Sequence, residues 1–193
     1  VPQRLHRVEP RRLARREDGH VINLRVGGLP SDTRLYYRFR AQGQQSAVGC
    51  TRTFPRWFDS PERVRFAVVS CQNYAQGFYN AFGDIADLGQ AGELDFVIHT
   101  GDYIYEGGPT GILGLAGLDR DHEAPNAEVF TVEEYRNRYA LYRLDPDLQR
   151  AHGALPFIVT WDDHEVENNY AGLADENGSP ANEFARRRRD AYQ

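Results

Sequence analysis

The chain has 193 residues, 40% of them hydrophobic, which is enough for a packed core in one large domain or two small ones. No apolar run approaches the roughly 18 residues of a membrane span, and the net charge of −5 argues against a general nucleic-acid-binding protein. Two cysteines exclude a disulfide framework, although a single bond between Cys50 and Cys71 stays open.

The N-terminal part of the chain carries the alternating pattern of β-strands. We expect strands at residues 20–26, 35–39 and 48–54, separated by turns rich in glycine. Three antiparallel strands with tight turns suggest the end of an immunoglobulin-like β-sandwich, which needs about seven strands. The segment Pro55–Glu62, which carries two prolines, marks the boundary, so we expect domains at 1–58 and 59–193.

The second part alternates apolar runs with stretches of helical spacing, which predicts an α/β domain with a parallel sheet. We expect strands at 64–69, 96–98 and 156–160, and helices at 77–90, at 131–143, from 145 onward and after the turn-rich stretch 175–180. Thr131 and Glu134 form a capping box, and Asp145-Pro146 starts the next helix. The glycine-rich stretch 107–117 is expected to be a loop. Three strands do not complete such a domain, so we expect a piece of a larger protein.

Metal-binding side chains follow all three predicted parallel strands. Cys71 follows the first strand, Asp102 and Tyr105 follow the second, and Trp161-Asp162-Asp163-His164-Glu165 follows the third. In open α/β sheets, chemistry lies just beyond the carboxyl ends of the strands. We therefore expect these side chains to meet in one site.

Each residue also has a plainer interpretation when it is taken alone. An aspartate after a glycine usually caps a turn, and a lone cysteine usually packs as a small hydrophobe. The coincidence at three strand ends favours function for Asp102 and Cys71. We expect His99, inside the second strand, to be a packing residue, and the run Arg186–Arg189 to be a solvated helix face.

The ligand types indicate which metals would bind. At pH 7 a phenolate costs about 4 kcal/mol and a thiolate about 2 kcal/mol, and calcium or magnesium rarely offset that cost. Cys71, Asp102 and Tyr105 therefore indicate iron, with zinc less favoured, whereas Asp162 and Asp163 suit calcium, magnesium or manganese. An Asp102 bridge would hold two ions about 3.5–4 Å apart and lower the pKa of bound water to near 7. Such a site suits in-line attack on a phosphate ester.

Three stretches of the sequence resemble the alkaline phosphatase D (PhoD) family of metallophosphoesterases. They are Ser70-Cys71-Gln72-Asn73-Tyr74, Gly101-Asp102-Tyr103-Ile104-Tyr105-Glu106 and the run from Trp161 to Tyr170. The resemblance covers about residues 20–193. It implies a metallophosphoesterase-type αββα sandwich, here its N-terminal half, preceded by the end of an immunoglobulin-like domain. It also implies a secreted or cell-envelope enzyme that hydrolyses phosphate monoesters and diesters with a metal-bound hydroxide.

The same resemblance implies a role for individual residues. Cys71, Asp102 and Tyr105 would bind ferric iron, Asp102 would also bridge to calcium, and Asp163 would be a ligand of the second metal. His164 would contact the phosphate in the transition state or protonate the leaving oxygen. Asn168 is a further candidate for the calcium shell, while the roles of Asp162 and Cys50 stay open.

Two alternatives remain beside the phosphoesterase. The family's opening strands, its twin-arginine signal peptide and a later Asp–His pair are not in this sequence, so a non-catalytic fragment or binding module is the first alternative. An iron–thiolate redox protein is the second, and it is disfavoured because Cys71 is a single thiol and the acidic cluster offers oxygen ligands. The natural substrate and the oligomeric state cannot be predicted from the sequence.

Overall fold

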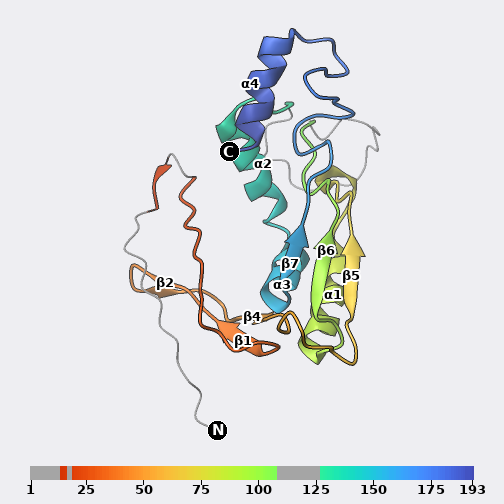
Figure 1. The fold of residues 1–193 in the computed structure, drawn as a ribbon. Coiled ribbons are helices and arrows are strands. Elements are labelled where there is room, and N and C mark those ends of the chain that lie inside the picture. Colours follow the sequence, from red (N-terminus) through yellow and green to blue (C-terminus); the bar gives the residue numbers. More distant parts are fainter. Residues whose placement is uncertain (1–13, 17–18, 108–126) are drawn as a thin grey trace.

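The structure is a computed structural model that describes residues 14–16, 19–107 and 127–193, shown as a ribbon in Figure 1. Most of the stretch predicted as a loop at 107–117 lies outside these residues. The described part contains a long β-hairpin, a three-stranded parallel sheet and four α-helices. No helix among the described residues is long and apolar enough to cross a membrane.

The hairpin forms from two of the three strands predicted in the N-terminal part. Strand β1 (Arg34–Tyr37) pairs antiparallel with β4 (Gly49–Arg52), and β2 (Arg40–Ala41) pairs with β3 (Gln44–Gln45) nearer the turn. The strand predicted at 20–26 is wrong, because no described strand lies beside this segment to pair with its backbone, and its apolar side chains are 37–57% exposed. The immunoglobulin-like sandwich and the domain boundary stay predictions.

The parallel sheet confirms the three strands predicted in the second part. Its order is β5 (Phe66–Val69), β6 (Phe96–His99), β7 (Phe157–Val159), and all three strands are parallel. The short 3-10 helix η2 (Tyr74–Gln76) and helix α1 (Asn80–Ala91) connect β5 to β6, which gives the predicted βαβ unit. The carboxyl ends of all three strands therefore point to one edge of the sheet (Figure 1).

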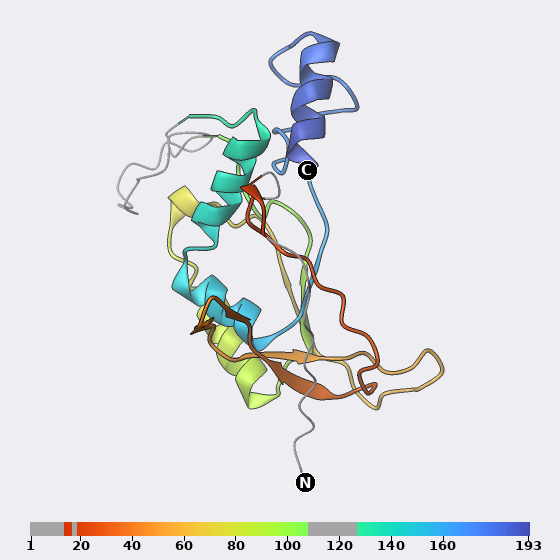
Figure 2. The same ribbon diagram turned by 90° about the vertical axis from the view of Figure 1, so that its left-hand side faces the viewer.

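The hydrophobic core lies on one face of this sheet. Helices α1 and α3 (Pro146–Ala154) cover that face (Figure 2), and Ala86, Val97 and Leu148 between these layers are fully buried. On the opposite face Phe66 and Val68 are 46% and 61% exposed, and no helix of the described chain covers them. The sheet is thus packed on a single side within the described residues.

The predicted helix starts are confirmed in atomic detail. The capping box opens helix α2 (Val132–Tyr142): Thr131 Oγ1 accepts from Glu134 N at 3.4 Å, and Glu134 Oε2 accepts from Thr131 N at 2.9 Å. Asp145 caps α3, since its Oδ1 accepts from the backbone N–H of Asp147 at 2.9 Å and of Leu148 at 3.0 Å. These caps satisfy backbone groups that lack partners inside the helix.

Helix α4 (Ala181–Ala191) corrects one expectation. The arginine run is not a uniformly solvated face, because Arg187 is only 6% exposed. Its guanidinium donates to Tyr135 Oη at 3.0 Å and pairs with Glu128 at 2.7 Å. Helix periodicity turns this one arginine toward α2, while Arg186 and Arg189 face solvent.

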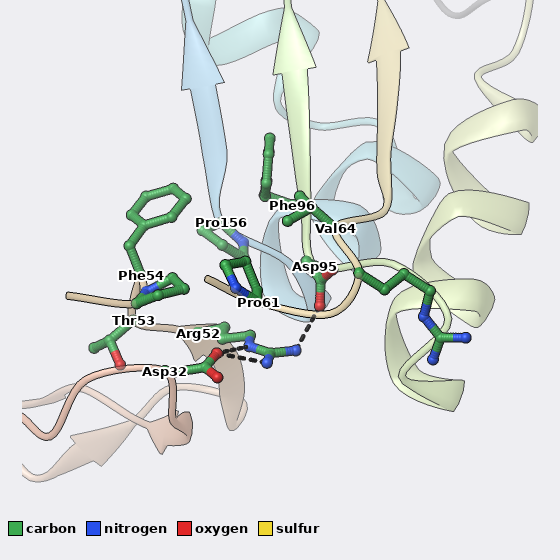
Figure 3. Close-up of a pocket in the computed structure, with 11 residues that line it drawn as sticks. Asp32, Arg52, Thr53, Phe54, Pro61, Val64, Asp95, Phe96 and Pro156 are labelled. Carbon is green, nitrogen blue, oxygen red and sulfur yellow. Dashed lines mark hydrogen bonds and ion pairs between the residues drawn. The ribbon is translucent and has the colours of Figure 1, made fainter. Parts of the chain in front are cut away.

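The hairpin contacts the opposite edge of the sheet from the one that carries the predicted metal ligands. Arg52 pairs with Asp32 and with Asp95, both at 2.5 Å, and Asp95 directly precedes β6 (Figure 3). Phe54 packs edge-to-face on Phe96 with ring centroids 5.6 Å apart. The hollow drawn in Figure 3 is therefore a joint between the hairpin and the sheet rather than part of the candidate site.

Candidate metal centre

The backbone at the strand ends brings the loops after β6 and β7 into close contact. Gly101 has φ +114°, and a Cβ at this position would lie 2.5 Å from the backbone N and the Cβ of Asp162. Asp102 and Cys71 have φ +54° and +56°, in the left-handed region that residues other than glycine rarely adopt. Such strained residues cluster at functional sites, and here they start the loops that carry the predicted ligands.

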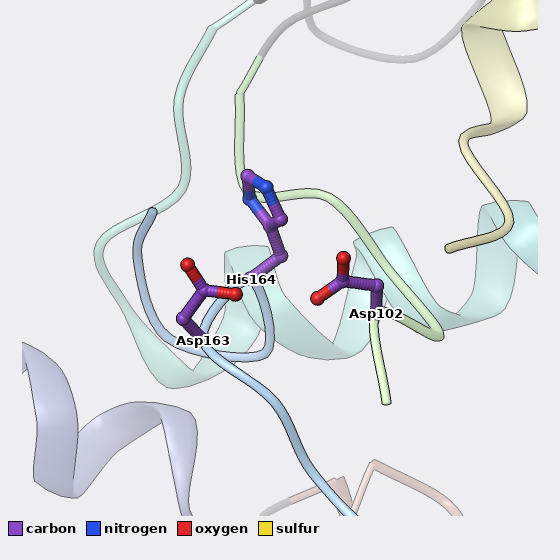
Figure 4. A group of neighbouring side chains, drawn as sticks. All are labelled: Asp102, Asp163 and His164. Atoms are coloured by element: carbon purple, nitrogen blue, oxygen red, sulfur yellow. The ribbon is translucent and has the colours of Figure 1, made fainter. Parts of the chain in front are cut away.

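Asp102, Asp163 and His164 form the core of the candidate metal centre. Each offers one ligand atom, and these atoms all lie within 4.8 Å of one another (Figure 4). Asp102 is 6% exposed, and its Oδ1 accepts no hydrogen bond within the described part of the chain. Burial raises the pKa of the Asp102 carboxyl, and the nearby Asp163 adds to the rise. A buried, unsatisfied acceptor beside a second carboxylate and an imidazole suits a cation.

Tyr105 and Cys71 lie next to Asp102, as the sequence predicts. The Tyr105 hydroxyl donates to Asp102 Oδ2 at 3.1 Å, and the Tyr105 ring lies against the His164 imidazole, tilted by 32°, with centroids 4.1 Å apart. Burial and then the Asp102 charge raise the pKa of Tyr105 above its usual value. The Cys71 thiol is close enough to lower the pKa of Asp102 and raise that of Tyr105. Only a strongly charged ion would hold Tyr105 as a phenolate here.

Asp163 is oriented by the chain that follows it. Its Oδ2 accepts from the backbone N–H of Asn169 at 2.5 Å, and Asn169 itself has φ +54°. The carbonyl oxygen of Asp163 accepts from Val166 N and Glu167 N, both at 2.8 Å, which closes a tight turn. The turn fixes the carboxylate of Asp163, which offers one ligand atom to the group.

His164 is held by Glu106, a residue that the sequence analysis did not select. Nδ1 of His164 lies 2.7 Å from Glu106 Oε2, and Glu106 Oε1 accepts from Asn168 N at 2.7 Å. Burial disfavours charge on His164, but the hydrogen bond and charge of Glu106 outweigh it, so the pKa of His164 is raised. Burial likewise disfavours charge on Glu106, yet His164 and Asn168 lower its pKa overall. With Nδ1 engaged, Nε2 is the nitrogen available to a ligand.

Other predicted residues lie outside this group. Asp162 is exposed, and the Asn168 side chain donates to Glu176 at 2.6 Å rather than facing the centre. Cys50 and Cys71 are both free thiols, so the disulfide left open by the sequence is absent from the described structure. Cys50 accepts from Arg34 Nε at 3.0 Å in the hairpin. His99 is fully buried, as predicted for a packing residue, and burial lowers its pKa to about 4.

Comparisons with known proteins show which proteins this chain is similar to. A family model described as PhoD-like phosphatase matches residues 66–193, and a model of the PhoD-like phosphatase N-terminal domain matches residues 3–55. Alkaline phosphatase D of Bacillus subtilis (strain 168) is 43% identical over 174 residues, which are 90% of this chain and 29% of that protein. A solved structure described as that of PhoD matches with a TM-score of 0.85 and 42% identity, over 93% of this chain and 33% of its own. The chain thus spans about a third of the length of the relatives it matches.

Proposed function

The chain belongs to the PhoD-like phosphatase family, and from this membership we propose that it is, or forms part of, a metal-dependent hydrolase of phosphate monoesters and diesters. The observation that carries the proposal is the buried Asp102 Oδ1, which lacks a partner in the described structure and lies within 4.8 Å of ligand atoms from Asp163 and His164. These residues lie at the carboxyl edge of a parallel sheet, where such folds place their chemistry.

We propose that two kinds of ion share this edge. Cys71, Asp102 and Tyr105 would hold ferric iron, and Asp102 and Asp163 would hold calcium, so that Asp102 is common to both. When bound, the metals would supply Lewis acidity and lower the pKa of water from about 15.7 toward 7. The thiolate and phenolate suit the more highly charged ion, and the carboxylates suit calcium.

His164 would contact the phosphate and serve as a proton donor. Glu106 raises the pKa of His164 and engages its Nδ1, so that Nε2 is the nitrogen left for the substrate. From Nε2 the imidazolium would donate to a phosphate oxygen, or give its proton to the leaving oxygen. The Tyr105 ring packed against it limits how far the imidazole can turn.

A non-catalytic binding piece is the second candidate. In this proposal the described residues offer calcium two carboxylates, Asp102 and Asp163, whereas calcium takes 6–8 oxygen ligands. Such a partial ligand set would bind metal weakly and turn over little substrate. The two candidates differ in whether metal binding and hydrolysis occur together.

Hydrolysis of bis-p-nitrophenyl phosphate by matched variants tests the proposal. The protein is stripped with a chelator and reloaded with Fe³⁺ and Ca²⁺, and Asp163→Asn is compared with Asp162→Asn, which changes the adjacent carboxylate outside the group. We expect the hydrolysis rate of Asp163→Asn to fall by more than the roughly 10–100-fold that is typical when a residue behind a metal ligand is replaced. The rate of Asp162→Asn should stay near that of wild type. Reloaded wild-type protein that binds both ions without turnover would favour the binding piece.

We also propose that the protein is secreted or held in the cell envelope, on the basis of family resemblance. The structure offers only the finding that no described helix spans a membrane. Fractionation of the producing cells with an antibody to this chain tests the location. Protein confined to the cytosolic fraction would contradict it.

A further inference from the structure

The side chain of Glu165 lies between the two loops that carry the candidate ligands. It is 1% exposed, and its carboxylate accepts three backbone hydrogen bonds. Asp102 N donates to Oε2 at 3.1 Å, Asp162 N donates to Oε2 at 2.8 Å, and Tyr103 N donates to Oε1 at 2.5 Å. Asp102 and Tyr103 follow β6 and Asp162 follows β7, so one carboxylate joins both loops.

The two loops require such a junction because their backbones turn away from regular pairing. Gly101 and Asp162 approach so closely that no side chain fits at position 101, and Asp102 adopts a left-handed conformation. Buried backbone N–H groups need acceptors, and the Glu165 carboxylate is the acceptor for three of them. Its removal would release both loops at once.

Glu165 is not itself one of the clustered ligands. Within the described residues the group that could hold a metal consists of Asp102, Asp163 and His164. Glu165 follows His164 directly, yet its carboxylate accepts hydrogen bonds from backbone N–H groups instead. Its contacts hold the backbone of the two loops in place, and Glu165 itself is not expected to bind the ion.

We propose that Glu165 is a positioning residue that sets the separation of Asp102 from Asp163 and thereby the affinity of the site for metal. The inference rests on the proposed function, because it concerns the same centre. The loop after β6 supplies Asp102 and the loop after β7 supplies Asp163, so any slip between these loops changes the distance between the two carboxylates. Replacing a group that orients metal ligands without binding the metal typically changes metal affinity about 10–100-fold.

Glu167 offers a matched control for a merely structural role. It lies two residues further along the same turn and is 2% exposed, so it is nearly as buried as Glu165. Its carboxylate instead contacts the Asn177 amide at 2.8 Å and Arg187 of α4 at 3.6 Å. Replacing Glu167 would perturb packing nearby without releasing the two ligand loops.

The test is a Mn²⁺ titration of metal-stripped wild type, Glu165→Gln and Glu167→Gln, followed by the electron paramagnetic resonance signal of the free ion. Mn²⁺ suits a group of carboxylates with one imidazole. We expect binding to weaken about 10–100-fold in Glu165→Gln and to stay within about twofold in Glu167→Gln. Equal effects of both variants, or none, would overturn the inference and leave the proposed function standing. A wild type that binds no Mn²⁺ would overturn both.

Amide hydrogen exchange in the metal-free wild type gives a second readout that needs no variant. The proposal requires the N–H groups of Asp102, Tyr103 and Asp162 to be protected before any metal binds, because Glu165 already accepts from them. Exchange of these three amides at the rate of an unstructured peptide would overturn it. If Glu165→Gln does not fold, this measurement decides the question alone.

Discussion

Replacing Glu106 by glutamine should lower the stability of the protein and its hydrolytic activity or metal affinity, although the change leaves every candidate ligand residue in place. The substitution keeps the volume of the side chain but removes the charge opposite His164 Nδ1, 2.7 Å away. A glutamine offers one carbonyl oxygen and one NH₂ group to two partners, His164 Nδ1–H and Asn168 N–H, which are both donors. Either one donor then faces another, or the imidazole gives up its Nδ1 proton and its charge, in a site where Glu106 is 4% exposed.

The magnitude follows from these contacts. A hydrogen bond to a charged group contributes about 1.5–3 kcal/mol, and a buried donor left unpaired costs about 1–3 kcal/mol. We expect Glu106→Gln to lower the free energy of unfolding by about 2–4 kcal/mol, and to lower kcat/KM or metal affinity by roughly 10–100-fold. Urea unfolding at pH 7 and hydrolysis of bis-p-nitrophenyl phosphate by the reloaded protein measure the two effects.

Glu134→Gln is the control for this prediction. Glu134 also accepts two backbone hydrogen bonds, from Phe130 N and Thr131 N at 2.9 Å each, but it lies on the surface at the start of α2. We expect a loss of about 1 kcal/mol at most, as for a helix cap, and unchanged hydrolysis. If Glu106→Gln matched this control in hydrolysis and metal affinity per folded molecule, Glu106 would be structural and our account of His164 would be refuted.

Two further predictions concern stability. Gly101→Ala should lower the free energy of unfolding by roughly 2–5 kcal/mol, because the backbone is strained and the new methyl group would overpack against Asp162. Gly153→Ala in α3, with open space around it, should be neutral or stabilising. Urea unfolding of both variants checks this prediction, and equal unfolding midpoints would contradict it. Burial lowers the pKa of His99 from its ordinary 6.5 to about 4, so the buried imidazole is neutral at pH 7. Its contribution to the free energy of unfolding is therefore complete above pH 6.5 and is lost as the pH falls toward 4. That window corresponds to about 3 kcal/mol, and a His99→Leu variant with the same pH dependence of unfolding as wild type would contradict it.

Local sequence signals predicted most of the second part of the chain. The capping box at Thr131, the Asp145-Pro146 start and the three apolar runs are short-range patterns, and the structure shows a helix or strand at each. The edge-of-sheet argument also placed Asp102, Asp163 and His164 together, because parallel strands must end on the same side. These features depend on residues close in sequence or on a general rule of topology.

The misses depend on partners far away in the sequence. The alternation at 20–26 is strand-like, but a strand needs a neighbour to pair with, and the pattern cannot say whether one exists. The arginine run was predicted to be solvated, because the sequence does not show that Arg187 meets Tyr135 of α2. Glu106 and Glu165 were missed as supporting residues, since nothing in their spacing shows that one would contact His164 and the other the backbone of three residues. The local signal was that each glutamate directly follows a predicted site residue, Glu106 after Tyr105 and Glu165 after His164.

The most direct test of the centre is the visible absorption spectrum of the protein reloaded with ferric iron, recorded for wild type and Tyr105→Phe. Tyr105 donates to Asp102 at 3.1 Å, so an ion bound by Asp102 would meet the phenol oxygen directly. We predict a tyrosinate-to-iron charge-transfer band in wild type that is absent from Tyr105→Phe, together with retained iron. A colourless wild type that retains no iron, or a band that survives in Tyr105→Phe, would contradict the proposed centre.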